Sequence, residues 1–242
     1  MNEEMIRISV AVVTYNGEHY IRQQLTSILA NLSGKDEVVI SDDGSTDATW
    51  TILEEYAAQD TRVRLLHGPG QGVIANVEHA LKHCRGSYIY LSDQDDVWMA
   101  DKVETVQRIF EQTGTHLIVH DCEVRNGTCD KVLMESFAAY RGGHAGFWKN
   151  LAKNTYIGCC MAFRSELLAY LFPIPKDIQM HDQWIGVIND LQYKDTVFVR
   201  DRLIWYRRHE NNTSDFSRNS IPVMIRNRLL FLKRILRRQR KY

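Results

Sequence analysis

The sequence predicts an α/β fold in which an open sheet is flanked by helices. Short runs rich in Val and Ile alternate with amphipathic stretches of ten or more residues through the first half of the chain, and polar clusters directly follow three of the apolar runs. Strands joined by helices of that length usually pair in parallel, and such a sheet binds ligands at the carboxyl ends of its strands. The polar clusters are therefore the expected location of the functional residues.

Four strand and helix pairs and a fifth strand are expected before residue 125. Each apolar run is bounded by Gly, Asn or Asp, whereas the stretches between the runs have apolar residues three or four positions apart. The second helix is expected to be capped by Thr46 or Asp47, and the fourth to begin near Asp101. The expected strands are 7–16, 38–40, 62–68, 86–96 and 116–124, and the expected helices are 18–32, one around 50–56, 73–84 and 98–114.

The second half of the chain is less regular. Residues 126–155 contain four glycines among polar and aromatic residues, which indicates a long connection or insertion. A strand running into a helix is expected at 156–171, a short helix at 180–190, and one or two strands at 196–209. Cys159 and Cys160 fall on the strand of the first segment, so we expect buried thiols that point to opposite faces.

Composition and charge exclude several classes of protein. The 242 residues carry 30 basic and 30 acidic side chains, so the balance of charge gives no reason to expect a nucleic-acid partner. Five cysteines without CxxC spacing argue against a disulfide framework or a zinc site. The first residues do not resemble a signal peptide, and no run is long and apolar enough to span a membrane. We therefore expect a cytoplasmic protein.

The last 18 residues, 225–242, form a basic amphipathic pattern. They contain eight basic residues and no acidic one. On a helical wheel Ile225, Leu229, Leu232 and Leu236 share a narrow face, and basic residues occupy the adjoining arc. Such a helix suits an anionic membrane surface, which would place the protein on the inner face of the cell membrane. A helix docked on its own domain or on a partner subunit is the equally weighted alternative.

Two of the polar clusters end the first and second strands. Asp42 and Asp43 follow the second strand, and Gly44 permits a tight turn, so both carboxylates can face the crevice and accept hydrogen bonds from a base or a ribose. An Asx turn with a helix cap is the alternative for these residues. The cluster after the first strand consists of Thr14, Tyr15 and Asn16.

The third cluster lies in LSDQDDVW, residues 91–98, at the end of the fourth strand. Its carboxylates repel one another and are costly to bury, so the cluster needs open water or a cation. Asp93 and Asp95 are two residues apart and are expected on the same side, where they would form a hard oxygen site for Mg²⁺ or Mn²⁺ shared with a diphosphate. Asp96 is expected to cap the next helix.

Taken in order, five motifs resemble those of the family 2 glycosyltransferases, which have the GT-A fold. The resemblance implies a Rossmann-like open mixed sheet in a catalytic domain of residues 1–216, with a nucleotide-binding half at about 1–100 and an acceptor-binding half at about 101–216. Residues 217–242 would be the basic helical tail. The motifs are VVTYNG at 12–17, SDDGSTD at 41–47, SDQDDVW at 92–98, MHDQW at 180–184 and YRRHENNTS at 206–214.

The resemblance also implies a role for each matching residue. Asp93 would approach the ribose, Asp95 would bind the metal with His209 completing the shell, and Asp182 would be the catalytic base. His181 can tune Asp182, contact the acceptor or pack, and is assigned to the acceptor side with Trp184, which is either a wall of the acceptor pocket or a core residue. The residues matching the nucleotide-sugar site are Thr14, Tyr15, Asn16, Asp42, Asp43, Gly44 and Asp93.

The leading hypothesis is a metal-dependent, inverting glycosyltransferase. The combination of SDQDDVW with HDxW and YRxHxxNxS is most similar to bacterial rhamnosyltransferases that build surface polysaccharides. This implies dTDP-L-rhamnose as donor, Mn²⁺ or Mg²⁺ as cofactor and a surface polysaccharide or lipid-linked glycan as acceptor. A UDP-hexose, with galactose or glucose, would use the same nucleoside and metal residues, because pocket shape selects the sugar.

Two further classes are weighed against this hypothesis. A catalytically inactive protein that only binds nucleotide sugar or glycan would not need Asp182 and Asp95, and both are present. A different α/β enzyme would show other motifs: the first strand lacks the GxGxxG of a dinucleotide-binding dehydrogenase, and the chain lacks GxxxxGK[ST].

Overall fold

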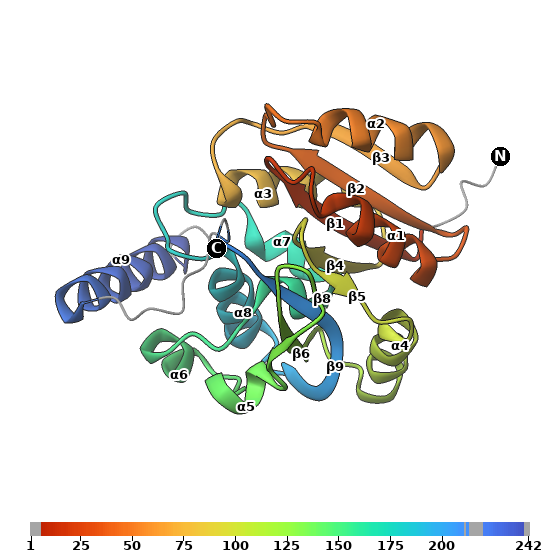
Figure 1. Ribbon diagram of the computed structural model, residues 1–242. Helices are drawn as coiled ribbons and strands as arrows, with labels where there is room; N and C mark the ends of the chain where they lie inside the picture. The colour runs from red at the N-terminus through yellow and green to blue at the C-terminus, as the bar shows by residue number, and fades with distance from the viewer. Residues whose placement is uncertain (1–5, 211, 213–219, 240–242) are drawn as a thin grey trace.

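The computed structural model describes residues 6–210, 212 and 220–239 (Figure 1). Within this part of the chain, nine strands form one sheet in the order β3-β2-β1-β4-β8-β6-β9-β5, with β7 paired to β6. The strands are β1 (Ile8–Thr14), β2 (Asp36–Asp42), β3 (Val63–His67), β4 (Tyr88–Ser92), β5 (Val97–Trp98), β6 (Leu117–Asn126), β7 (Val132–Met134), β8 (Met161–Arg164) and β9 (Val197–Arg208).

Helices flank this sheet, as Figure 1 shows, so the open mixed sheet expected from the sequence is confirmed. Two short 3-10 turns, Gly158–Cys160 and Ser165–Leu167, precede and follow β8. The helices are α1 (Ile21–Asn31), α2 (Thr49–Gln59), α3 (Val73–His83), α4 (Lys102–Thr113), α5 (Phe137–Arg141), α6 (Phe147–Ala152), α7 (Leu168–Leu171), α8 (His181–Gln192) and α9 (Ile221–Gln239).

The first four long strands pair in parallel, as predicted. β1 lies between β2 and β4, and β3 pairs with β2. Every residue of β2 and all but one of β1 are buried, because the sheet is covered on both faces. Thr14, Asp42 and Ser92 are the last residues of β1, β2 and β4. Because these strands run in the same direction, the three residues lie at the same edge of the sheet.

The fifth expected strand, now β6, does not pair with β4. β8 lies between them and runs antiparallel to both. A local apolar pattern identifies β6 and β8 as strands, but the choice of neighbour depends on contacts between distant segments. β9 then pairs in parallel with β6, and the short β5 pairs antiparallel with β9, which brings residues 93–98 beside residues 204–208.

Several local expectations are wrong in detail. Cys159 and Cys160 are buried free thiols, but they belong to the 3-10 turn before β8, so the strand alternation expected for them does not apply. Asp96 does not cap a helix, because β5 intervenes before α4 begins at Lys102. The residue at the cap position of α2 is Ala48, although Asp47 accepts hydrogen bonds from the backbone N–H and the hydroxyl of Thr49.

The C-terminal helix α9 is docked on the domain through a different face from the row of Ile and Leu that the sequence singled out. Phe231 and Ile235 are buried, and the Phe231 ring packs edge to face against Trp184 of α8. Ile225, Leu229 and Leu236 remain exposed. The expected boundary at 216 and 217 lies outside the described residues. Within the described part of the chain, none of the helices is both long and apolar enough to cross a bilayer.

Candidate active site

The carboxylate of Asp42 closes the turn after β2. One of its oxygens accepts hydrogen bonds from the hydroxyls of Thr14, at 2.8 Å, and Ser45, and the other accepts from the backbone N–H of Ser45 at 2.9 Å. Gly44 has a φ of +90°, which a residue with a side chain rarely adopts. The Asx turn considered as an alternative is therefore present, and it joins the ends of β1 and β2.

Asp43 holds the glycine-rich loop that precedes α3. Its two carboxylate oxygens accept hydrogen bonds from the backbone N–H groups of Gly70, at 2.8 Å, and Gly72, at 2.7 Å. Asp43 is only half-buried, and Asp42 beside it is buried. Both carboxylates thus position loops at the carboxyl edge of the sheet, and their contact with a nucleoside stays a prediction.

Gln94 connects the ends of β1 and β4. Its side-chain amide accepts a hydrogen bond from the Tyr15 N–H at 2.8 Å and donates one to the Tyr15 carbonyl at 3.0 Å. A Cβ atom on Gly17 would lie 2.4 Å from the Gln94 oxygen, so Gly17 leaves room for this pairing. Asn16, with a φ of +50°, accepts a hydrogen bond from the Thr46 N–H. The sequence assigned no role to Gln94, which positions Tyr15 and leaves its ring exposed.

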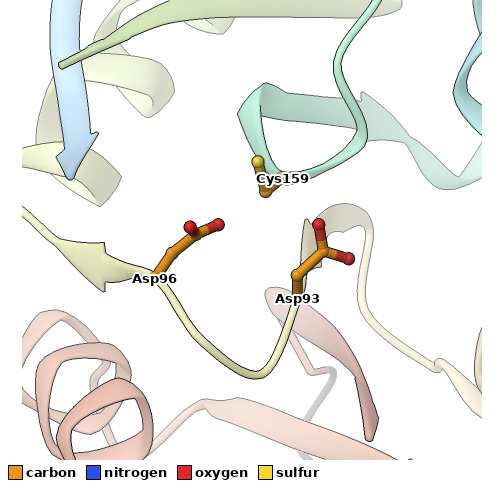
Figure 2. Close-up of side chains that lie close together, drawn as sticks. All are labelled: Asp93, Asp96 and Cys159. Carbon is orange, nitrogen blue, oxygen red and sulfur yellow. The ribbon is translucent and has the colours of Figure 1, made fainter. Parts of the chain in front are cut away.

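An acidic cluster lies immediately after β4 (Figure 2). Ligand atoms of Asp93, Asp96 and Cys159 lie within 4.8 Å of one another, and Figure 2 shows the three side chains converging from the β4–β5 segment and from the turn before β8. β4 ends at Ser92, so the strand alternation that predicted Asp93 and Asp95 on one side does not extend to them. Asp93 is instead grouped with Asp96.

Burial and like charge disfavour ionisation of this cluster. The pKa of Asp93 is raised to about 7, mainly by burial and further by the charges of Asp95 and Asp182. Burial also raises the pKa of Asp96 well above its ordinary value. The buried ammonium of Lys102 partly compensates: it donates to the Cys159 carbonyl at 3.1 Å and lies 3.9 Å from the centre of the Trp98 ring. The cluster therefore favours an additional cation.

Asp95 faces the end of β9. One of its carboxylate oxygens lies 2.8 Å from Nε2 of His209 and accepts a hydrogen bond from the Asn212 amide at 3.1 Å. The His209 ring stacks on Tyr20, with 4.4 Å between the ring centres. The fold thus brings together the two residues that the sequence assigned to a metal. A carboxylate oxygen and an imidazole nitrogen that converge in this way fit Mn²⁺ or Mg²⁺ as partial ligands.

Arg207 is the buried cation that fixes this arrangement. Its guanidinium donates to the carbonyl oxygens of Asp95 and Gly127 and to the Gln23 side chain, each at 2.6 Å. Its backbone N–H donates to Asp96 at 3.1 Å. Its burial and these four hydrogen bonds give Arg207 a positioning role.

Asp182 lies in the first turn of α8 and is buried. Its Oδ1 accepts hydrogen bonds from the Gln183 N–H and from the Asn154 amide, the latter at 3.0 Å. Burial raises the pKa of Asp182 to about 6, and the bond from Asn154 partly opposes this effect. The charge of Asp182 also contributes to the raised pKa of Asp93, so the start of α8 faces the segment after β4. Asn154 belongs to the irregular connection, and no motif marked it.

The two residues assigned to the acceptor side are both buried. Burial lowers the pKa of His181 to about 4, so its ring is neutral near pH 7, and its Nε2 packs against Gly158. Trp184 is a core residue whose indole N–H donates to the Leu171 carbonyl. Residues two apart on a helix point in nearly opposite directions, so Trp184 cannot share the side of Asp182. An acceptor contact by His181 stays a prediction.

Two curated proteins are similar to this chain over most of its length. EpsH from Bacillus subtilis is 27% identical over 217 residues, which cover 84% of this chain and 61% of EpsH. The Escherichia coli protein WfgD, named as a UDP-Glc:α-D-GlcNAc-diphosphoundecaprenol β-1,3-glucosyltransferase, is 26% identical over 76% of this chain and 70% of its own length. The chain thus spans about three-fifths of the length of EpsH.

Two solved structures have the same fold. S. aureus TarS in complex with UDP-GlcNAc superimposes with a TM-score of 0.68 and 20% identity, covering 88% of this chain and 62% of TarS 1-349. The mannosyltransferase PcManGT from Pyrobaculum calidifontis, in complex with GDP-Man and Mn²⁺, superimposes with a TM-score of 0.65 and 21% sequence identity. The superposition covers 85% of this chain and 58% of the PcManGT chain.

The model of the family described as Glycosyl transferase family 2 matches residues 9–172. This match extends from β1 to the residue after α7, and it includes the turns of Asp42 and Asp43 and the acidic cluster after β4. Asp182 and His209 lie beyond it. Because the match covers more than half of the chain, the chain belongs to glycosyltransferase family 2.

Proposed function

We propose that this glycosyltransferase performs an inverting, metal-dependent transfer of a sugar from a nucleoside diphosphate donor to a hydroxyl group of a glycan. The observation that carries the proposal is the placement of Asp182: a buried carboxyl group in the first turn of α8, bonded to the Asn154 amide, whose charge contributes to the raised pKa of Asp93 after β4. Inversion requires a base on the side of the sugar opposite the departing diphosphate. Asp182 reaches this region from a different element, α8, than the acidic residues after β4.

Each group of side chains has a distinct task in this proposal. The turns of Asp42 and Asp43 form the nucleoside side of the site together with Thr14, and Asp93 approaches the ribose. Asp95 and His209 would hold Mn²⁺ or Mg²⁺, which when bound supplies positive charge to the diphosphate leaving group. Asp182 takes the proton of the acceptor hydroxyl, and the hydrogen bond from Asn154 orients its carboxylate. Arg207 holds the backbone of Asp95 in place.

Two donors are supported by different observations. The motif combination that ends in YRRHENNTS is similar to rhamnosyltransferases and supports dTDP-L-rhamnose. WfgD, whose name specifies UDP-Glc and a diphosphoundecaprenol acceptor, matches three-quarters of the chain and supports UDP-glucose. In both cases we place the reaction in the cytoplasm, with a surface polysaccharide precursor or lipid-linked glycan as acceptor.

A donor panel separates these two possibilities. The purified chain is incubated with Mn²⁺ or Mg²⁺, GlcNAc-diphosphoundecaprenol or a short glycan, and one donor from dTDP-L-rhamnose, UDP-glucose, UDP-galactose, UDP-GlcNAc or GDP-mannose. The released nucleoside diphosphate is measured. We expect one of the first three donors to exceed the others by about 10-fold or more, because pocket contacts of about 1–3 kcal/mol discriminate similar sugars. Donor binding without release from any of them would favour an inactive binding protein.

The rate of sugar transfer should rise with pH through the pKa of Asp182. A base must be ionised, and the pKa of Asp182 is raised to about 6. Below this pH the carboxyl group is protonated and inactive, and above it the rate should rise to a plateau. Asn154→Ala removes a hydrogen bond that favours the carboxylate, so the acid limb of kcat should move to higher pH. Asn126→Ala, at the end of β6, is the control; an acid limb that responds equally to both variants, or to neither, contradicts the assignment.

A further inference from the structure

Four apolar side chains lie exposed on α9, apart from the face that is docked. Ile221 and Leu229 are 68% and 62% exposed, and Ile225 and Leu236 are about half exposed. At about 100° per residue these four side chains fall within an arc of about 80°. The buried Phe231 lies on a different side of the helix. The helix therefore has a second apolar face, which contacts water in the described part of the chain.

A row of cations borders this apolar face on the side away from the domain. Arg226, Lys233 and Arg237 are exposed and lie on the next arc of the helix. Arg234, by contrast, points toward the domain and pairs with Asp177. Residues 220–242 contain no acidic side chain, although the charges of the whole protein sum to zero. The excess of positive charge is thus local to this segment.

Trp148 of α6 extends the apolar surface beyond α9. Its side chain is 73% exposed. It lines, together with Phe147, Leu232 and Leu236, a groove of about 620 Å³ between α6 and α9. Figure 1 shows the two helices next to each other at one end of the molecule. Because Trp148 and Leu236 line the same groove, the ring lies beside the exposed row of α9. We call Ile221, Ile225, Leu229, Leu236 and Trp148 the apolar row.

We propose that the apolar row and the neighbouring cations form a surface that binds an anionic lipid bilayer, with α9 lying in the plane of the membrane. A helix with an exposed apolar arc and an adjoining cationic arc buries the first in the acyl boundary and pairs the second with anionic headgroups. Tryptophan is enriched at that depth because its ring is apolar and its N–H polar. A second copy of the chain fits less well, since apposed surfaces would bring the cations of both copies together.

The groove end of this surface lies apart from Asp182, and the exposed side chains of α9 are on a different face from Phe231, which packs on Trp184. α8 begins with Asp182 in its first turn and ends near the groove, which is also lined by Asp190 and Leu191. Membrane binding can therefore be measured without turnover, so its failure and the failure of the proposed reaction are distinguishable. Changes in the exposed row should leave transfer to a short, water-soluble acceptor unchanged.

The test is co-sedimentation of the full chain with vesicles of phosphatidylcholine, with and without 30 mol% phosphatidylglycerol (about a third, enough to give a negative surface potential). We expect binding to the anionic vesicles and blue-shifted Trp emission. The triple variants Ile225→Ser/Leu229→Ser/Leu236→Ser and Arg226→Ser/Lys233→Ser/Arg237→Ser should each weaken binding by about 10-fold or more. The controls are Val132→Ser/Leu133→Ser, on exposed β7, and Arg108→Ser/Lys131→Ser/Arg200→Ser, which removes the same charge.

Three outcomes would overturn the proposal. The first is equal vesicle binding by wild type and both triple variants. The second is the absence of binding to anionic vesicles by wild type. The third is a change from dimer to monomer in the apolar triple variant with vesicle binding unaffected, which would assign the row to a second copy. Circular dichroism of each variant checks that it folds. If the variant with three apolar substitutions does not fold, the variant with Arg226, Lys233 and Arg237 replaced still tests the proposal, because it alters only exposed side chains.

Discussion

Replacing Asp182 with Asn is expected to lower kcat for sugar transfer by about 10²–10⁴-fold, the usual contribution of a general base. The amide keeps the shape of the side chain and can still contact Asn154 and the Gln183 N–H, but it cannot accept a proton from the acceptor hydroxyl. Binding of the nucleoside diphosphate, measured by calorimetry, should stay near the wild-type value because Asp182 lies on α8, away from the turns of Asp42 and Asp43. Single-turnover measurements with saturating donor report the chemical step directly.

A second buried carboxylate on the same helix gives a matched control for this experiment. Asp190 accepts hydrogen bonds from the Tyr156 hydroxyl at 2.7 Å and from the Gly146 N–H at 2.9 Å, and it lies two turns further along α8. Asp190→Asn should keep turnover. If Asp182→Asn retained turnover, Asp182 would not be the base. If both variants lost it together with thermal stability, the effect on Asp182 would be structural.

Replacing Asp95 with Ala is expected to lower metal-supported transfer by about 100-fold or more. The variant would bind the divalent ion more weakly, and the positive charge of that ion stabilises the departing diphosphate. Asp95→Ala also removes the acceptor for His209 and Asn212. The measurement is initial rate against Mn²⁺ concentration, together with Mn²⁺ binding by electron paramagnetic resonance. Asp101→Ala, on the exposed residue before α4, is the control. A wild-type rate that is unchanged in excess chelator would remove the metal from the mechanism.

The position of the ion can be decided with two further variants. An ion bound by Asp95 and His209 should be weakened by His209→Ala and unaffected by Cys159→Ala. An ion bound in the cluster of Asp93, Asp96 and Cys159 should show the opposite pattern, because Cys159 contributes its thiol only there. Binding of Mn²⁺ to each variant distinguishes the two sites whether or not the protein turns over.

Much of the grouping of polar residues at the carboxyl edge of the sheet was predictable because these residues end strands or follow them directly. Parallel strands bring their carboxyl ends to one edge, so Thr14, Asp42 and the SDQDD cluster had to lie near each other once the strands were identified. The pattern did not show what each carboxylate contacts. Asp42 accepts a local hydrogen bond from the Ser45 N–H, which depends on the conformation of the turn. Asp43 accepts one from the Gly70 N–H, 27 positions away, which depends on where the loop before α3 lies.

Residues that join distant segments were not predictable in the same way. Asn154 donates to Asp182 across 28 positions, and Arg207 binds the Asp95 carbonyl across 112. Gln94 pairs with Tyr15 across 79. Neither the periodicity of the chain nor its composition carries information on such pairs, since each bond depends on the paths of two separate segments. The strand β8 was predicted, but its antiparallel position between β4 and β6 was not, for the same reason.

The sequence by itself determined the alternation of strands and helices, the open sheet, the family and the residues that match its motifs. These follow from side-chain periodicity and from short local signals, which act within a few residues of each other. The tertiary structure alone decided that Trp184 belongs to the core, that Asp93 groups with Asp96, that Asp95 meets His209, and that α9 docks through Phe231 with its other apolar face exposed. Each of these depends on packing between segments far apart in the chain, where burial and charge choose among faces that the local pattern leaves equivalent.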